Sequence, residues 1–144
     1  MSDIMNREIK FRGKCSPQSK YKGEWVTGSL VVPEQIKDNE VLIVVAHSDN
    51  CKTTYHVDKD TIGQFTGLYD KNGKEIYEGD ILRFYFNGNE HIVYVGFNSE
   101  VGAWCVAFKG SRYVGTTPLG VWLCEHKDIE NIGNVHDNSE LIKE

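Results

Sequence analysis

Apolar and polar residues alternate along most of this chain with the two-residue period of β-strands. Residues 9–12 and 52–57 alternate, whereas 41–46 is a continuous β-branched run, as in a strand covered on both faces. Further strands are predicted at 25–32, 81–86, 91–97, 101–108, 112–114, 121–124 and 129–135. Helical signals are scarce and predict single turns at 33–37 and 139–142.

Glycine and asparagine mark the connections between the predicted strands. Asn72-Gly73 lies between short apolar flanks and predicts a hairpin with a type I′ turn, because Asn-Gly tolerates positive φ angles. The segment 87–90 predicts a second hairpin. Strand spacings of about 8–12 residues are typical of sandwiches and small barrels. We therefore predict a mainly β fold with little helix, in which short antiparallel strands form a small SH3-like barrel in the C-terminal half, packed with an N-terminal β lobe.

The length of the chain indicates one domain. Its 144 residues fall within the range of about 100–200 that one domain takes, and there is no repeat, low-complexity tract or long linker. Residues 1–144 are expected to form a single domain with room for two lobes, 6–57 and 58–137, and a tail at 138–144.

The composition excludes several classes of protein. Hydrophobic residues make up 40% of the chain and aromatic residues 11%, which argues against intrinsic disorder. No apolar run approaches the roughly 20 residues of a membrane-spanning helix, and the first residues lack the features of a signal peptide. The four cysteines form no CxxC pair and are expected as free thiols, with Cys105 and Cys124 in the core. A protein of a reducing cytoplasm, with no membrane contact, is predicted.

The net charge of -5 is an average over two different halves. Up to Asn72 there are ten basic and ten acidic residues, and after it six basic and eleven acidic residues. Segment 7–22 holds six basic residues and one acid, whereas 125–144 holds six acids and two lysines. A uniformly basic face for duplex DNA is therefore not expected, and the oppositely charged ends could attract each other within a chain or between subunits.

Two carboxylates, Glu78 and Asp80, suggest one enzymatic hypothesis. Carboxylates that share a face can hold Mg²⁺, so a metal-dependent hydrolase or nuclease is one alternative. The recurrence of Gly67, Gly73 and Gly79 at six-residue intervals favours turns and a fold-determining role for the same segment. The chain has no GxSxG elbow, P-loop or GxGxxG motif. We therefore assign no catalytic residue and no cofactor, and favour a protein that is not an enzyme.

Histidines and cysteines offer zinc-ligand types without the spacing of a zinc site. His47, Cys51 and His56 lie in one stretch, and Cys124 and His126 lie in another. Zinc sites usually contain tight pairs such as CxxC, which are absent here, so no metal site is assigned. Cys124 and His126 are also the residue types of a thiol–imidazole pair for nucleophilic catalysis. A chain with five histidines and four cysteines is expected to contain such neighbours by chance.

Aromatic residues crowd the second half of the chain. They are Phe84, Tyr85, Phe86, Tyr94, Phe97, Trp104, Phe108, Tyr113 and Trp122. In a small barrel about half would face the core, and the rest would fill an oligomer interface or form a stacking platform for single-stranded nucleic acid. The candidate binding residues of such a platform are Tyr85, Arg83, Lys109 and Arg112, and Arg83 and Tyr85 share a strand face by alternation.

Three segments resemble a known family. They are IKFRG at 9–13, GQFTGLYDKNGKEIYEGDI at 63–81 and DIENIGNVHDNSEL at 128–141. Their order and spacing resemble the YopX family of proteins encoded by bacteriophages and prophages, over nearly the whole chain. Ser139 stands where the family's closing NPEL stretch has proline, which bears only on the conformation of the tail. The resemblance implies a mainly β fold of phage origin and supplies no activity or catalytic residue.

Three functional hypotheses follow. The leading one is a phage or prophage accessory protein that binds a protein or single-stranded nucleic acid and does not catalyse a reaction. It would also self-associate, because many short strands leave edges that need covering. The alternatives are the metal-dependent hydrolase and an acidic mimic of DNA that occupies a host DNA-binding protein.

Overall fold

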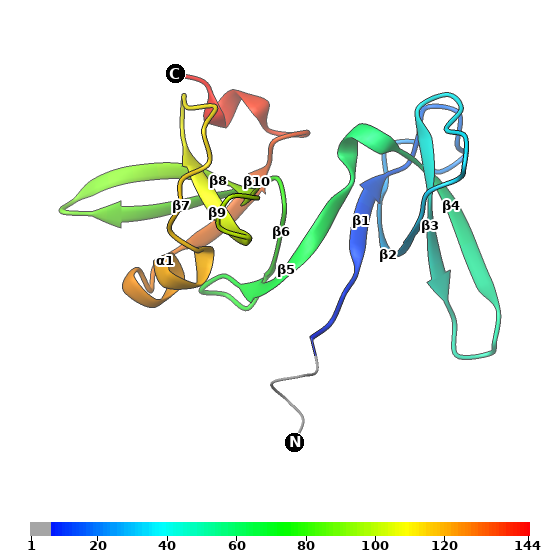
Figure 1. Ribbon diagram of the computed structural model, residues 1–144, viewed down its shortest axis with the longest axis horizontal. Helices are drawn as coiled ribbons and strands as arrows, with labels where there is room; N and C mark the ends of the chain where they lie inside the picture. The colour runs from blue at the N-terminus through cyan, green and yellow to red at the C-terminus, as the bar shows by residue number, and fades with distance from the viewer. Residues whose placement is uncertain (1–6) are drawn as a thin grey trace. The chain divides into compact units, whose positions relative to one another are not determined.

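The computed structural model describes residues 7–144, and these residues form a mainly β protein (Figure 1). Its strands are β1 (Phe11–Lys14), β2 (Trp25–Val31), β3 (Glu40–Ala46), β4 (Lys52–Asp58), β5 (Gly63–Tyr69), β6 (Glu75–Tyr77), β7 (Asp80–Phe86), β8 (Asn89–Asn98), β9 (Ala103–Phe108) and β10 (Glu130–Asn134). Its helical segments are η2 (Lys59–Thr61), α1 (Leu119–Glu125) and η3 (Ser139–Ile142). The predicted fold class is thus confirmed. No helix within residues 7–144 has the length and apolar character needed to cross a membrane.

The chain divides into two compact units, and the boundary along the sequence falls between Phe65 and Thr66, within β5. The first residues of β5 pair with β1, and its later residues belong to the second unit. This point lies later in the chain than the lobe boundary expected after Val57. Each unit buries a hydrophobic core of its own.

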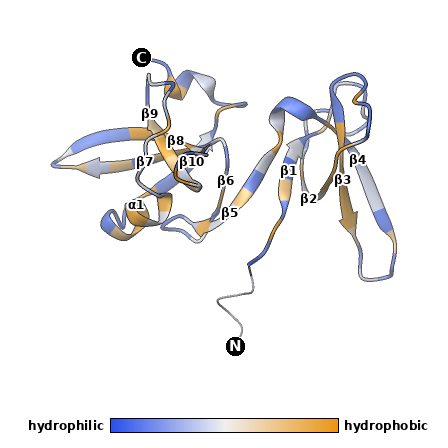
Figure 2. Cartoon of the chain, in the orientation of Figure 1, coloured by the Kyte–Doolittle hydropathy of each residue, from blue (hydrophilic) through white to orange (hydrophobic). Residues whose placement is uncertain are grey.

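The N-terminal unit contains the first four strands of a six-stranded antiparallel sheet in the order β4-β3-β2-β1-β5-β6, which continues through β5 to β6 of the second unit. Its core consists of Cys15, Val41, Ile43 and Val57. β3 is hydrophobic after its first residue, Glu40 (Figure 2), yet only Val41 and Ile43 are fully buried, and Leu42 between them is half-buried. The expectation that this strand is covered on both faces is therefore wrong, because one face of the sheet takes most of the burial.

The C-terminal unit contains a curled antiparallel sheet in the order β10-β7-β8-β9. This half-barrel corresponds to the small barrel predicted for the C-terminal half. Its core consists of Ile76, Leu82, Phe84, Val93, Val95, Val106, Leu119 and Ile129. The register between β10 and β7 shifts between Asn131 and Gly133, a bulge that bends the edge of the sheet.

One predicted strand is a helix. Residues 121–124 lie in α1, which packs Trp122 and Leu123 against the core together with the buried Leu119. The spacing of these three residues, i, i+3 and i+4, is that of one helix face, and a short apolar run does not by itself distinguish a helix from a strand. As a consequence Cys124 is exposed rather than in the core, whereas Cys105 is buried as expected. Residues 112–114 form no strand and 33–37 no helical turn, while the turn predicted at 139–142 is present as η3.

The type I′ turn lies at a different Asn-Gly pair from the predicted one. Asn87 and Gly88 have φ angles of 51° and 79°, and they join β7 to β8 directly. In the loop between β5 and β6, Gly73 has a positive φ angle (79°) but Asn72 does not. A two-residue I′ turn needs positive φ at both positions, so the predicted hairpin is present there with a longer loop.

Candidate functional site

α1 covers part of one face of the C-terminal sheet, and apolar side chains continue along this face beyond the helix. Alternation along β7 places Leu82, Phe84 and Phe86 on this inner face. The antiparallel register sets His91 of β8 opposite Phe84, and Phe108 of β9 lies on the same face. Phe84 is buried, but Phe86 and Phe108 are 54% and 43% exposed. The inner face therefore opens to solvent at the end nearest the β7–β8 turn.

An open pocket of about 340 Å³ lies at this end of the sheet. This aromatic pocket is lined by Phe84, Phe86, His91, Phe108, Trp122, Glu125 and His126. α1 supplies Trp122 and Glu125, and His126 ends the helix with its backbone N–H donating to the Trp122 carbonyl at 2.8 Å. Spacings of three and four residues place these side chains on one side of the helix. The pocket thus forms where α1 meets the exposed end of the sheet.

The rings around the pocket hold one another in place. Phe84 is the common contact: its ring centroid lies 4.6 Å from that of His126, 5.2 Å from His91 and 5.7 Å from Trp122. Trp122 also stacks on His126 at 5.6 Å and meets the edge of Phe108 at 5.8 Å. These separations lie within the favourable range of about 4.5–7 Å for aromatic pairs. The walls are therefore formed before any group enters.

The pocket is lined by rings, two of them imidazoles, and by one carboxylate. Among its lining residues, Glu125 is the one that carries a full charge at neutral pH when the histidines are neutral. The Glu125 side chain is exposed at the edge of the ring cluster. Aromatic faces beside a carboxylate suit a flat or cationic group.

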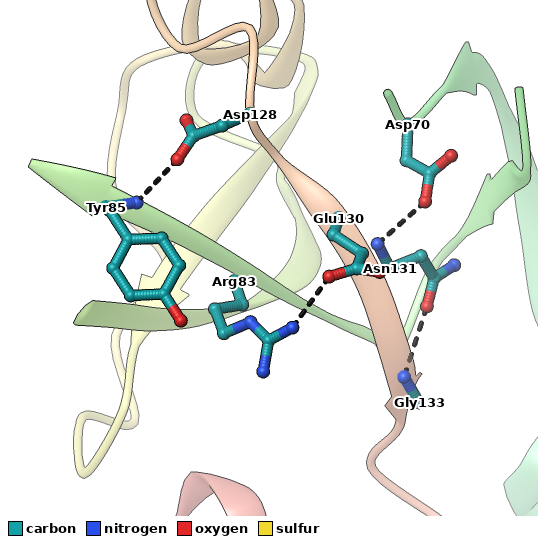
Figure 3. A network of polar contacts seen from close by, with 7 residues as sticks. All are labelled: Asp70, Arg83, Tyr85, Asp128, Glu130, Asn131 and Gly133. Atoms are coloured by element: carbon teal, nitrogen blue, oxygen red, sulfur yellow. Dashed lines mark hydrogen bonds and ion pairs between the residues drawn. The ribbon is translucent and has the colours of Figure 1, made fainter. Parts of the chain in front are cut away.

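The residues of the central signature segment have structural roles. Asp70 Oδ1 accepts hydrogen bonds from the backbone N–H groups of Asn72 (2.8 Å) and Lys74 (2.9 Å), and Oδ2 accepts from that of Asn131 (2.8 Å; Figure 3). Burial alone would raise the pKa of this carboxyl. The three backbone donors and the Lys74 ammonium outweigh that effect, so the pKa of Asp70 lies below its usual value. Asp70 thus ties the β5–β6 loop to β10.

Asp80, half of the candidate metal pair, is only 1% exposed. Its Oδ2 accepts hydrogen bonds from the backbone N–H of Tyr77 (2.7 Å) and from Asn131 Nδ2 (2.8 Å). Glu78, the other member, is half-buried. Over residues 7–144, no three His, Cys, Asp or Glu side chains converge as a metal site requires. The geometry therefore favours the fold-determining role of Asp80.

The zinc-ligand candidates lie in different settings. His47 Nε2 is 2.7 Å from Thr53 Oγ1 on the β3–β4 hairpin, and His56 Nδ1 is 3.4 Å from Glu40 Oε1. Cys51 is exposed in the hairpin loop. In the C-terminal unit His126 lines the aromatic pocket, whereas the exposed Cys124 does not.

Two of the four candidate binding residues lie together on the outer face of β7 (Figure 3). Arg83 Nη2 donates to Glu130 Oε1 at 2.7 Å, and this hydrogen bond is the main reason that the pKa of Arg83 is raised. The Tyr85 side chain is 50% exposed, and its backbone N–H donates to Asp128 Oδ2 at 2.9 Å. Arg83 and Tyr85 thus face away from the aromatic pocket, with the guanidinium paired within the fold.

The other two candidates follow β9. Lys109 is exposed directly after the strand. Arg112 lines a second pocket of about 370 Å³, together with Tyr94, Lys143 and residues of the C-terminal turn. Neither Arg83 nor Tyr85 lines that pocket, and none of the four lines the aromatic pocket.

Comparison with known proteins identifies the family. The model of the YopX protein family matches residues 10–143. The chain belongs to the YopX family. The crystal structure of protein EF1440 from Enterococcus faecalis is similar to this YopX chain, with a TM-score of 0.55 and 19% sequence identity over 96% of this chain and 100% of that chain. At this identity the likeness shows the fold alone. None of the curated proteins compared with the chain matches it.

Sequence reasoning missed three residues of the aromatic pocket in this YopX chain. The sequence pattern assigns no site role to His91 or Glu125, and it places His126 only beside Cys124. The sequence does contain a signal for this wall of the pocket, because Trp122, Glu125 and His126 have the spacing of one helix face. Treating 121–124 as a strand concealed it.

Proposed function

We propose that this YopX-family chain is a phage- or prophage-encoded accessory protein that acts in the bacterial cytoplasm as a non-enzymatic binding module for a protein partner. The observation that carries the proposal is the aromatic pocket, which is open to solvent and walled by rings that already pack together. Exposed aromatic side chains around a concave site are typical anchors of protein interfaces. The phage origin rests on the resemblance of the three sequence segments.

The charge of the pocket favours a protein over a nucleic acid. Proteins that bind single strands combine stacking aromatics with cations that follow the phosphates. Here the charged lining residue is the acid Glu125, and Arg83 on the opposite face is paired with Glu130. A phosphate backbone at the pocket would meet the wrong charge.

Several acids of the second half are engaged within the fold. Asp80 is buried, Glu130 pairs with Arg83, and Asp128 accepts from the Tyr85 backbone. These acids hold the C-terminal unit together. The pocket therefore supports the proposal better than mimicry of DNA does.

Matched substitutions on the two faces of β7 test the proposal. Phe86→Ser removes an exposed wall of the pocket, and Tyr85→Ser removes a similarly exposed ring from the opposite face. We expect a phage or host protein that binds the wild type to bind Tyr85→Ser equally well. The same protein should bind Phe86→Ser at least about tenfold more weakly, as after the loss of an interface anchor. Equal retention by both variants would contradict the proposal. Thermal melts confirm that each variant folds.

Salt-titrated DNA binding provides an independent check. Fluorescence anisotropy with labelled single-stranded and duplex DNA should show no binding that depends on the pocket. Binding that falls steeply with salt, and that Tyr85→Ser weakens while Phe86→Ser does not, would support nucleic-acid contact through the Arg83 face instead.

Self-association is a further part of the proposal. β4 and β6 end the strand order of the six-stranded sheet, and β9 and β10 end that of the four-stranded sheet. Such edges offer unpaired backbone groups to another strand. Sedimentation equilibrium across a range of concentrations tests it, and a monomer at all of them would remove this part.

A further inference from the structure

We infer that the aromatic pocket binds the guanidinium group of an arginine side chain on the protein partner. The inference rests on the proposed function and names the chemistry that the pocket recognises. Its basis is the combination of ring faces and one carboxylate around a single opening.

The rings provide the first part of the recognition. A cation within about 6 Å of an aromatic centroid is attracted by the negative face of the ring, and tryptophan is the strongest of the aromatic partners. Trp122 lines the pocket with the exposed rings of Phe86 and Phe108, and its centroid is 5.8 Å from that of Phe108. Because the rings lie so close together, a group that enters the pocket contacts more than one of them. The volume of about 340 Å³ suits one side chain and its immediate surroundings.

Glu125 provides the second part. It lies three residues after Trp122 on α1 and lines the same opening. A guanidinium can pair its N–H groups with a carboxylate while its flat face stacks on a ring, which a neutral side chain cannot do. A lysine ammonium is more strongly hydrated and lacks the flat face, so arginine fits this site better.

The half of the chain that forms the pocket has an excess of acidic residues. After Asn72 the chain carries eleven acidic and six basic residues. Lys127, the nearest cation in sequence to Glu125, lines a different pocket. The field around the C-terminal unit therefore attracts a basic segment and repels a phosphate. Charge complementarity thus selects a cationic peptide of another protein as the occupant.

Three synthetic peptides test the inference on the wild-type protein. They share one sequence of glycine and serine and differ at a central residue, which is arginine, lysine or citrulline, the neutral analogue of arginine. Binding is followed by NMR through the indole N–H signals of the three tryptophans, assigned with Trp→Phe variants. We expect the arginine peptide to move the Trp122 signal and to bind about tenfold more tightly than the citrulline peptide, with lysine between them.

Matched acidic variants locate the effect. Glu125→Gln removes the charge at the pocket, and Glu100→Gln removes an exposed charge from the β8–β9 loop of the same unit. We expect Glu125→Gln to abolish the preference for arginine over citrulline and Glu100→Gln to retain it. The peptide affinities are compared on the wild-type protein, so the test holds even if Glu125→Gln is unstable.

The outcomes separate this inference from the proposed function. Equal binding of arginine and citrulline, or no movement of Trp122 with any peptide, overturns the arginine assignment, while the Phe86→Ser experiment still decides whether the pocket binds a partner. Movement of the Trp122 signal with protein concentration alone, lost in Glu125→Gln, would make a second copy of the chain the occupant and overturn the assignment to another protein. Movement with a single-stranded oligonucleotide instead of the peptides would overturn it as well.

Discussion

Asn131 connects the two buried aspartates of the signature segment. Its backbone N–H donates to Asp70 and its side-chain amide donates to Asp80. The amide also reaches the Glu75 carbonyl at 3.2 Å, while its Oδ1 accepts from the Gly133 backbone at 3.3 Å. One residue, through its backbone and its side chain, thus ties β10 to the β5–β6 loop and to the start of β7. Residues with this many buried partners are expected to matter for stability rather than for chemistry.

Asp80→Ala tests this interpretation directly. The substitution leaves the Tyr77 N–H and the Asn131 amide without their acceptor in a buried site, so we expect a loss of about 1–3 kcal/mol in the free energy of unfolding. Urea denaturation followed by tryptophan fluorescence measures it. An unchanged stability, together with loss of a Mg²⁺-dependent nuclease activity, would favour the metal-site hypothesis for Glu78 and Asp80 instead.

Asp70 makes the stability of the C-terminal unit depend on pH. Its pKa in the folded protein lies below the usual value of 3.8, so its contribution is fully present above that pH and is lost as the pH falls through the lower folded value. We expect Asp70→Asn to be less stable than the wild type at neutral pH, with a difference that shrinks as the pH falls below 3.8. Denaturation curves at several pH values measure this. A difference that stays constant with pH would show that the lost hydrogen-bond geometry, not the charge, is responsible.

At the scale of elements, α1 decides whether the aromatic pocket exists. This seven-residue helix is too short to be stable alone and is held by packing Leu119, Trp122 and Leu123 against the sheet. It begins after Pro118, which makes no side-chain cap hydrogen bond. The β7–β8 hairpin supplies the opposite wall, and its I′ turn sets the register that pairs Phe84 with His91.

Gly120→Ala should strengthen α1. A methyl group at this position meets no atom within 4 Å, and alanine restricts the unfolded chain more than glycine does. We expect a gain of about 0.5–1 kcal/mol in the free energy of unfolding, measured by denaturation. Gly73→Ala is the matched control: it is equally free of contacts, but its φ angle of 79° strains alanine, so it should lose about 1 kcal/mol. A loss in Gly120→Ala would indicate that the helix needs a flexible residue there.

At the scale of the whole molecule, the chain carries two hydrophobic cores. The core of the N-terminal unit is built around β3 and the end of β4, and that of the C-terminal unit around β7, β8, β9 and α1. The two compact units share only the strand β5 along the chain. Separate cores allow the units to respond separately to core substitutions.

Leu82→Ala tests that separation. Leu82 is fully buried in the C-terminal core, and its truncation should cost about 2–5 kcal/mol. We expect hydrogen exchange, read by mass spectrometry, to accelerate in β7, β8 and β9 while β3 keeps its protection. The reciprocal change Val57→Ala should act on β3 and β4. Equal acceleration in both units after either change would show that the chain unfolds as one cooperative body.

Local patterns accounted for most of the strands and for little of the site. The strands around Asn87-Gly88 were predicted close to their true ends, because alternation and a turn signal occur together there. Residues 121–124 were mistaken for a strand, because their helical face is completed by Leu119, outside the run. Aromatic and basic character alone selected the four candidate residues Arg83, Tyr85, Lys109 and Arg112. Such character does not reveal whether a cation is paired with an acid in the folded protein, as Arg83 is with Glu130.

The sequence by itself determined that this protein is mainly β and where its signature turns lie, because strand alternation and glycine requirements act over a few neighbouring residues. The tertiary structure alone decided the aromatic pocket. Phe86, His91 and Phe108 come from three different strands, and Trp122 and Glu125 come from the helix beside them. Their approach depends on strand register and on the docking of α1, and both are set by contacts between residues far apart in the chain.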